Sequence, residues 1–252
     1  MLTACGFTHV GRVRPTNEDC WLIDDELGLY IVADGMGGHN AGEVASQLAV
    51  DVIRAFLDRT RAGEDVTWPF GVNPLLSFNA NRLLTALKIA NRRVFRESES
   101  RGEYTGMGTT VVAALVDGVN VVYASVGDSR LYLLDGARIT QLTRDDSWIA
   151  TMVAANPALD RRSLAMHPMR HVLTSVIGGR EQLDVEPWER TLSSGEQLLL
   201  CSDGLHNALD DDVIADILCR EADVERATVQ LVETAVERSG ADNTTAVLLR
   251  IS

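Results

Sequence analysis

Short apolar runs rich in Val, Ile, Leu and Tyr recur along the chain and predict a protein built largely on β-sheet. The clear runs cover residues 27–33, 108–116, 119–126, 130–134, 196–202 and 243–251. Two weaker runs lie near residues 2–9 and 183–191. Apolar residues that recur every three to four positions predict helices over residues 41–60, 79–100, 210–222 and 224–240. We therefore expect two helices early in the chain and two late.

The order of these elements indicates how they pack. Strands cluster between the helix pairs, and Asp117-Gly118 and Asp135-Gly136 have strands on both sides, as in tight hairpin turns. Antiparallel sheets between helical layers fit this order better than a parallel α/β alternation. Thr109 and Thr110 open one strand and are explained by β-propensity. Residues 62–78 are expected to form a loop with an aromatic anchor, and residues 144–182 short helical pieces.

Composition narrows the setting of the protein. The chain has 252 residues, 46% of them hydrophobic, which is ample for a buried core and leaves one large or two small domains open. Its formal net charge of -13 repels nucleic acid and anionic membrane surfaces. No apolar run approaches the roughly 18 residues that span a bilayer, no signal peptide is recognisable, and the cysteines form no C-x-x-C pair. We expect a cytoplasmic protein with reduced thiols that binds neither nucleic acid nor a membrane.

Two Asp-Gly pairs are poorly explained as hairpin turns. Asp34-Gly35 and Asp203-Gly204 each end an apolar strand and precede a helical segment instead of a returning strand. Asp128 follows another strand, and Asp242 lies just before one. Carboxylates at strand ends can converge on one rim of a sheet, where they repel each other unless a cation is present. The pattern indicates Mg²⁺ or Mn²⁺, although each aspartate alone is explained equally well as a helix N-cap or turn former.

The glycine-rich stretch over residues 35–42 has the layout of a phosphate-binding loop but not its chemistry. Gly37 and Gly42 satisfy G-x-x-x-x-G, yet Glu43 stands where such a loop has its lysine. A carboxylate there repels a triphosphate, so nucleotide binding is disfavoured. The carbonyl of Gly35 can instead approach a cation directly, because no side chain shields it.

Eight short motifs cover nearly the whole chain in this order: GRVRPTNED, VADGMGGHNAGEVAS, MGTTVVAALV, VGDSRLYLL, LTRDDS, HVLTSVIGG, LCSDGL and ADNTTAVLL. In their order these motifs resemble the bacterial branch of the metal-dependent protein phosphatases of type 2C. The resemblance implies an α+β fold, a four-layer αββα sandwich of two antiparallel sheets flanked by helix pairs, with the metal site at one end of the sheets. It also implies a single catalytic domain over residues 1–252, with a flap at about residues 147–182.

The resemblance further implies which residues hold the metals: Glu18, Asp19, Asp34, Gly35, Asp128, Asp203 and Asp242. Asp34 matches the residue that bridges two metals, and the carbonyl of Gly35 matches a ligand of the second metal. Asp203 and Asp242 match ligands of the first, while Glu18 and Asp19 match positions that hold the metals directly or through water. Asp128, together with Asp203, resembles a pair that binds a further, weaker metal in bacterial members. Two Mg²⁺ or Mn²⁺ ions at the catalytic centre, and a third beside them, are therefore expected.

Catalysis is assigned by the same resemblance to Arg14 and Asp34. Arg14 matches the arginine that clamps the substrate phosphate, a task that suits a planar guanidinium. Asp34 matches the bridge between cations roughly 4 Å apart, whose shared water attacks phosphorus. Met36 stands where animal members have a histidine proposed as general acid, so a metal-bound water is the expected proton donor. His39 lies nearby, and a hydrogen-bonding or surface role is expected for it.

The resemblance implies phosphoserine and phosphothreonine in proteins as substrates, and a bacterial serine/threonine kinase as the opposing enzyme. A monomer is expected. The alternative is a catalytically inactive phosphatase fold that serves as a regulatory or binding module, although its mark, loss of a metal aspartate, is not found in the sequence. A metal phosphohydrolase acting on small molecules agrees with the carboxylate pattern but not with the order of the motifs.

Overall fold

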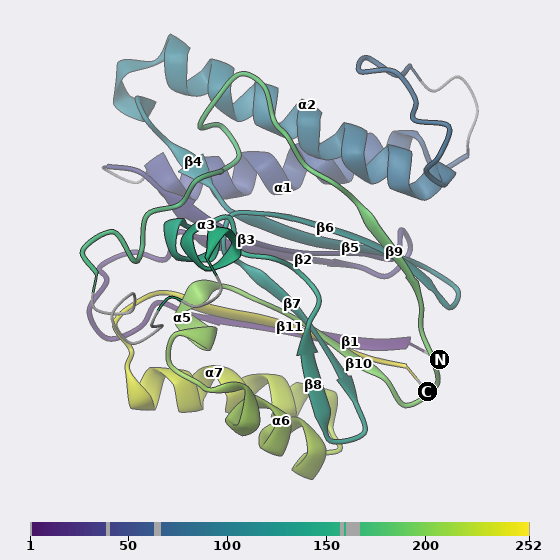
Figure 1. Ribbon diagram of the computed structural model, residues 1–252, viewed down its shortest axis with the longest axis vertical. Coiled ribbons are helices and arrows are strands. Elements are labelled where there is room, and N and C mark those ends of the chain that lie inside the picture. Colours follow the sequence, from purple (N-terminus) through teal and green to yellow (C-terminus); the bar gives the residue numbers. More distant parts are fainter. Residues whose placement is uncertain (1, 39–40, 63–66, 157–158, 160–166, 252) are drawn as a thin grey trace.

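Two antiparallel sheets lie face to face at the centre of the protein, and helices cover their outer faces (Figure 1). The computed structural model describes residues 2–38, 41–62, 67–156, 159 and 167–251. The first sheet has the order β2 (Asp19–Asp24), β3 (Leu29–Met36), β5 (Val111–Asp117), β6 (Asn120–Val126) and β9 (Trp188–Thr191), with β4 (Gly108–Thr109) paired to β3. The second has the order β1 (Leu2–His9), β11 (Thr244–Ile251), β10 (Gln197–Cys201), β7 (Arg130–Asp135) and β8 (Arg138–Gln141).

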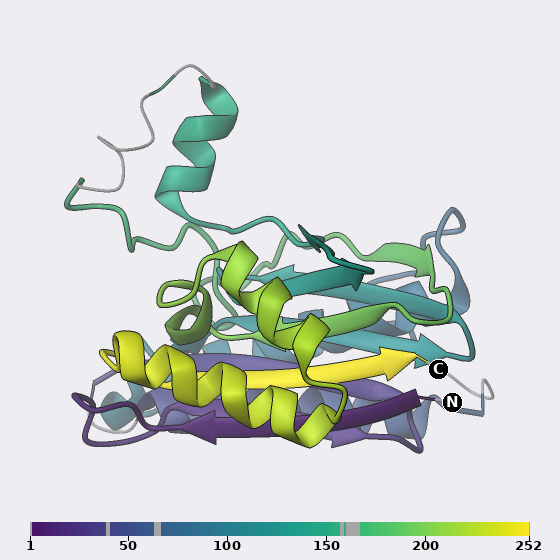
Figure 2. The same ribbon diagram turned by 90° about the horizontal axis from the view of Figure 1, so that it is seen from below.

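The helices form the two outer layers. Helices α1 (Ala41–Arg59) and α2 (Phe78–Ser100) cover the first sheet, while α6 (Asp211–Arg220) and α7 (Val224–Arg238) cover the second (Figure 1). Two short helices, η1 (Gly102–Tyr104) and α5 (Asp203–His206), follow α2 and β10. Figure 2 shows α3 (Trp148–Ala155) standing away from the sandwich.

Three clusters of buried apolar side chains fill the three interfaces between these four layers. Ile31 of β3 belongs to the cluster that it shares with Ile53 of α1. Its neighbour Tyr30 belongs to the cluster between the sheets, together with Leu249 of β11. Successive side chains of a strand point to opposite faces, so one strand serves two interfaces and reads as a continuous apolar run. The third cluster joins the second sheet to α5, α6 and α7. The predicted α+β, four-layer αββα sandwich is confirmed.

The predicted strands and long helices are present, and two strands, β2 and β8, were not predicted. The four long helices begin and end within two residues of their predicted limits. The turns at Gly118 and Gly136 join β5 to β6 and β7 to β8, with positive φ angles of 61° and 57°. Strands β2 and β8 carry no clear apolar run, because their side chains are mostly half-buried or exposed. Their place in the sheets comes from pairing with β3 and β7.

The predicted loop over residues 62–78 holds its aromatic anchor, although residues 63–66 lie outside the described part of the chain. The ring of Trp68 packs edge-on against Phe78, with 6.0 Å between ring centroids. Ser77 caps α2, because its hydroxyl accepts a hydrogen bond from the N–H of Ala80 at 3.1 Å. A flap at residues 147–182 stays a prediction, and residues 157–158 and 160–166 of it are not described. None of the described helices has the length and apolar character needed to cross a membrane.

Candidate metal centre

The predicted site residues come from strand ends that meet at one end of the two sheets. Neighbouring strands are antiparallel, so the end of one strand lies beside the start of the next. Strand β3 ends at this place, and β2 begins there. Strands β7 and β11 also begin there, beside the ends of β6 and β10. The structure therefore brings together five predicted aspartates: Asp19, Asp34, Asp128, Asp203 and Asp242. Burial raises the pKa of Asp34, and the charges of the other four aspartates raise it further.

Asp19 and Asp34 stand directly opposite each other in the β2–β3 ladder. Their neighbours Cys20 and Ala33 pack toward α1, so the two carboxylates lie on the face between the sheets. The sequence predicted that the strand ends at Asp34-Gly35. In the structure β3 instead continues to Met36 and pairs with β4.

Two threonine hydroxyls hold the backbone of Asp34. The N–H of Asp34 donates to Thr110 Oγ1 at 3.1 Å, and its carbonyl accepts from the Thr110 N–H at 2.8 Å and from Thr109 Oγ1 at 2.9 Å. Thr110 Oγ1 also lies 2.6 Å from the hydroxyl of Ser129, the residue after Asp128. Strand propensity alone therefore does not account for these threonines, since they also fix the position of Asp34.

Gly35 and Gly204, the glycines of the two Asp-Gly pairs in the site, each pack closely against another backbone segment. A Cβ on Gly35 would lie 2.1 Å from the carbonyl oxygen of Gly42, at the start of α1. A Cβ on Gly204 would lie 2.0 Å from the carbonyl oxygen of Asn243. No side chain fits at either position, so close packing explains these glycines independently of any contact between the Gly35 carbonyl and a cation.

Arg14 reaches the site from the loop between β1 and β2. Its Nη2 donates to Asp242 Oδ2 at 2.7 Å, and its side chain is 51% exposed. This ion pair raises the pKa of the guanidinium. One edge of Arg14 is thus fixed beside the carboxylates while half of its surface faces solvent, as expected of a group that receives a ligand from outside.

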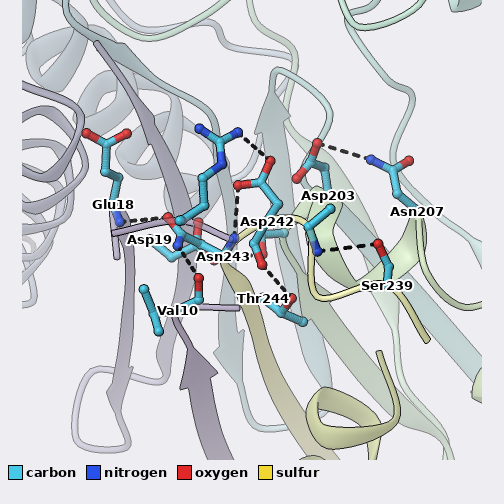
Figure 3. Close-up of polar contacts among 12 residues, drawn as sticks. Val10, Glu18, Asp19, Asp203, Asn207, Ser239, Asp242, Asn243 and Thr244 are labelled. Atoms are coloured by element: carbon cyan, nitrogen blue, oxygen red, sulfur yellow. Dashed lines mark hydrogen bonds and ion pairs between the residues drawn. The ribbon is translucent and has the colours of Figure 1, made fainter. Parts of the chain in front are cut away.

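The side chain of Asn243 holds the same loop (Figure 3). Its Nδ2 donates to the carbonyls of Val10 and Thr16, each at 2.9 Å, and its Oδ1 accepts from the N–H of Glu18 at 2.9 Å. Asn243 directly follows Asp242, so one short segment supplies both the partner of Arg14 and the clamp for its loop. The sequence alone did not suggest this role.

Burial and repulsion by neighbouring carboxylates raise the pKa values of Asp19, Asp34, Asp128 and Asp203. Burial, then the charges of Asp19 and Asp203, raise the pKa of Asp34 well above its usual range. Burial raises the pKa of Asp19 to about 7, and burial followed by the charge of Asp203 raises that of Asp128 to about 7. The pKa of Asp203 rises through burial and the charge of Asp242, while a hydrogen bond with Asp34 opposes the rise. A divalent cation among these groups would remove the repulsion and favour their charged forms.

The cluster has donor atoms that suit a cation, but its side chains are not yet arranged around one point. Oδ1 of Asp19 and Oδ1 of Asp203 are buried and accept no hydrogen bond. A buried carboxylate oxygen without a partner is costly, and a hard divalent cation satisfies it well. However, no three His, Cys, Asp or Glu side chains of the described ranges already surround one point closely enough to hold a metal ion. The donor atoms fit a cation, but binding requires the side chains to adjust.

Glu18 contributes differently from the aspartates. Its carboxylate lies beside the start of α1, where a Cβ on Gly42 would be 2.6 Å from its Cδ atom. In Figure 3 it points away from Asp203 and Asp242. Its carbonyl accepts from the N–H of Gly35 at 3.1 Å and from Ser46 Oγ at 2.7 Å. The backbone of Glu18 therefore braces the site, and a direct ligand role for its carboxylate stays a prediction.

One histidine supports the site, and another cannot be placed. His206 Nε2 lies 2.9 Å from the carbonyl oxygen of Asp128, and burial lowers the pKa of the imidazole to about 4. The ring is therefore neutral at neutral pH, and its Nε2–H donates to that carbonyl. No motif or spacing in the sequence singles out His206. His39 lies outside the described residues.

Comparison with known proteins identifies the family to which this fold and site belong. The sequence matches the family described as Protein phosphatase 2C over residues 6–238. The chain therefore belongs to the protein phosphatase 2C family, and the predicted family is confirmed. The serine/threonine phosphatase stp of Listeria welshimeri is 32% identical over 249 residues, which are 96% of this chain and 93% of that protein.

Solved structures agree with this assignment. The serine/threonine phosphatase of S. agalactiae superposes with a TM-score of 0.87 at 30% identity, covering 100% of both chains. The catalytic domain of the serine threonine protein phosphatase PstP, in complex with two manganese ions, superposes with a TM-score of 0.81 at 30% identity, covering 100% of this chain and 99% of that one. The family, the fold and the metal dependence of the enzyme class follow from these findings.

Proposed function

We propose that this protein removes phosphate from phosphoserine and phosphothreonine side chains of other proteins, at the cluster formed by its five aspartates. The predicted enzyme class, a metal-dependent protein serine/threonine phosphatase, is confirmed by the family and by the named relatives. The observation that carries the assignment to this site is the pair of buried, unpartnered oxygens of Asp19 and Asp203 beside the half-exposed Arg14.

The residues that would hold the cations are the side chains of the predicted set and the carbonyl of Gly35, and Asp34 would take the central position among them. Bound Mg²⁺ or Mn²⁺ would supply positive charge for the phosphate oxygens and would lower the pKa of the attacking water. Asp34 suits a central position because four other aspartates act on its carboxylate. Asp128 and Asp203, which repel one another, are the proposed holders of a third cation.

Arg14 is the proposed phosphate-binding residue. A guanidinium presents several N–H donors in a plane and binds two phosphate oxygens at once. The bond to Asp242 orients Arg14 through Nη2 and leaves its exposed half for the substrate. The planar pairing predicts that lysine is a poor replacement, because an ammonium offers only a point charge.

The proton for the leaving oxygen does not come from Met36, because a thioether carries no ionisable proton. Met36 ends β3 opposite Gly108. Serine and threonine alkoxides are poor leaving groups, so a donor is required, and water in the site is the proposed one. The side chains of Arg14 and the aspartates would hold that water in place.

Purified protein tests the proposal directly. With Mn²⁺ it should release phosphate from a phosphothreonine peptide, and EDTA should stop the reaction reversibly. No release from any of several phosphoserine and phosphothreonine peptides would contradict the proposal and favour an inactive binding module. Faster hydrolysis of a nucleotide than of the peptides would instead favour a small-molecule phosphohydrolase.

We also propose a cytoplasmic, monomeric enzyme that opposes a bacterial serine/threonine kinase. The four cysteines, Cys5, Cys20, Cys201 and Cys219, are all free in the structure, which suits a reducing compartment. Phosphoproteomics of a deletion strain, compared with a strain that carries an inactive variant, would identify the sites that this enzyme keeps dephosphorylated.

A further inference from the structure

The two oxygens of the Asp19 carboxylate are in different situations. Oδ2 accepts a hydrogen bond from Thr245 Oγ1 at 2.6 Å and another from Ser202 Oγ at 2.8 Å. Oδ1 is equally buried and accepts none. The two hydroxyls thus hold one oxygen and leave the other free for a ligand.

Both hydroxyls have reason to donate their proton to Asp19. Ser202 Oγ already accepts from the N–H of Thr245 at 3.0 Å, so its own O–H is available for the carboxylate. Thr245 Oγ1 lies 2.7 Å from Thr8 Oγ1, which in turn accepts from Asn17 Nδ2 at 2.9 Å. Asn17 can only donate through that nitrogen, so the donors run in sequence from Asn17 through Thr8 and Thr245 to the carboxylate.

This chain of hydrogen bonds from Asn17 through Thr8 and Thr245 to Asp19, here called the relay, crosses the space between the sheets. Asp19 belongs to β2 of the first sheet, whereas Thr8 and Thr245 belong to β1 and β11 of the second, and Ser202 directly follows β10. Thr8 and Thr245 are paired in the β1–β11 ladder, which fixes their separation. The direction of the Asp19 side chain is therefore set by the rigid opposite sheet instead of by its own strand.

We propose that Ser202 and Thr245 are positioning residues for Asp19, which fix its rotamer so that Oδ1 faces the cation that the neighbouring aspartates share. The inference rests on the metal centre of the proposed function. Partners behind a metal ligand typically change metal affinity by roughly 10- to 100-fold. The hydroxyls of Ser202 and Thr245 occupy Oδ2. Without them the carboxylate could rotate, and Oδ1 would accept hydrogen bonds from other groups instead of facing the cation.

Isothermal calorimetry with Mn²⁺ alone tests this inference on the purified full chain. We expect Thr245→Val and Ser202→Ala each to weaken Mn²⁺ binding roughly 10- to 100-fold, since Val keeps the shape of Thr and removes only the hydroxyl. Thr245→Ser restores the hydroxyl and should bind like the wild type. Thr234→Val, which removes a hydroxyl bonded to the Gln230 carbonyl on α7, is the matched control and should have no effect.

The outcomes separate the positioning role from a merely structural one. At saturating Mn²⁺ the KM for a phosphopeptide should stay unchanged in every variant, while the Mn²⁺ concentration for half-maximal rate moves with the calorimetric affinity. Unchanged Mn²⁺ affinity in folded Ser202→Ala and Thr245→Val overturns the inference but leaves the proposed function intact. Wild-type protein that binds no Mn²⁺ overturns both. If Thr245→Val does not fold, Ser202→Ala and Thr8→Val, which breaks the relay one step further back, decide the matter in the same way.

Discussion

Asp19 and Asp34 face each other across the β2–β3 ladder with both carboxylates turned between the sheets. Like charges directly opposite one another destabilise a strand pair. Burial adds to this cost, as the raised pKa values of both groups show. The divalent cations that we propose for this site would supply positive charge at that point and favour the charged forms of both carboxylates.

Asp203→Asn should abolish turnover. Asp203 places a buried, unpartnered oxygen in the cluster, and an asparagine amide lacks the negative charge that a carboxylate offers to a hard cation. We expect kcat to fall by more than the roughly 100-fold that loss of an outer-sphere partner costs. Initial rates on a phosphopeptide at several Mn²⁺ concentrations measure this. Asp216→Asn, on the exposed face of α6, is the control. Normal activity of Asp203→Asn would place the metal centre elsewhere.

Arg14→Ala should act on substrate binding. Charged hydrogen bonds contribute about 1.5–3 kcal/mol, so KM for a phosphopeptide should rise roughly 10- to 100-fold. KM is measured at saturating Mn²⁺, because Arg14 also pairs with Asp242, a proposed metal ligand, and a change in metal affinity must not enter the comparison. Arg12→Ala removes a guanidinium two residues away, whose side chain packs beside Gly240, and serves as the control. An unchanged KM in Arg14→Ala would contradict the phosphate-binding role.

Gly35→Ala should destabilise the fold before any metal binds. The added Cβ would lie 2.1 Å from the carbonyl of Gly42, and a backbone atom cannot move aside without shifting α1. We expect a loss of about 1–3 kcal/mol or more in the free energy of unfolding, measured by urea denaturation in EDTA. Gly38→Ala, where no atom of the described residues other than the chain neighbours lies within 4 Å of the added atom, is the matched control. Equal stability of the two variants would show that β3 and α1 are less closely packed than described.

Asp128→Asn should stabilise the metal-free protein at high pH. The folded state holds the proton of Asp128 to a pKa of about 7, against 3.8 for a free side chain. The folded state therefore binds this proton more tightly, so its stabilising effect is complete below pH 4 and is lost as the pH rises toward 7. The asparagine has no such proton to lose. Relative to wild type, the variant should gain roughly 1–4 kcal/mol between pH 4 and pH 8.

Urea denaturation in EDTA at pH 5 and pH 8 measures this difference. Both proteins keep His206, so the difference reports the Asp128 carboxylate together with its repulsion of Asp34. A difference in stability that is the same at both pH values would show that Asp128 is already ionised in the folded, metal-free protein.

Apolar periodicity predicted most elements and antiparallel sheets between helical layers, whereas the four-layer αββα arrangement was implied by the family resemblance. Strands such as β3 and β5 are buried on both faces and therefore read as apolar runs. Strand β2 was not predicted because its sequence, DCWLID, mixes charged and apolar residues at a half-buried edge. The consequence for the site is direct, since Asp19 lies opposite Asp34 only because that strand exists.

The aspartates were predictable and their supports were not. A carboxylate at the end of an apolar strand stands out, whereas Ser202, Asn243 and Thr245 are ordinary residues for a cap, a turn and a strand. Their roles depend on which backbone groups and carboxylates the fold places within 3 Å of them. One signal was available, since all three lie within three residues of a predicted ligand, but only the structure shows which oxygen each one contacts.

Anomalous diffraction from crystals grown with Mn²⁺ tests the central claim most directly, because it locates the metal without reference to activity. We predict two strong manganese peaks at the end of the sheets, within ligand distance of Asp34, of the Gly35 carbonyl and of the side chains of Asp203 and Asp242. Oδ1 of Asp19 should face them directly or through water. Manganese found only elsewhere on the protein, or absent from this cluster at saturating concentration, would contradict the assignment of these aspartates as the metal centre.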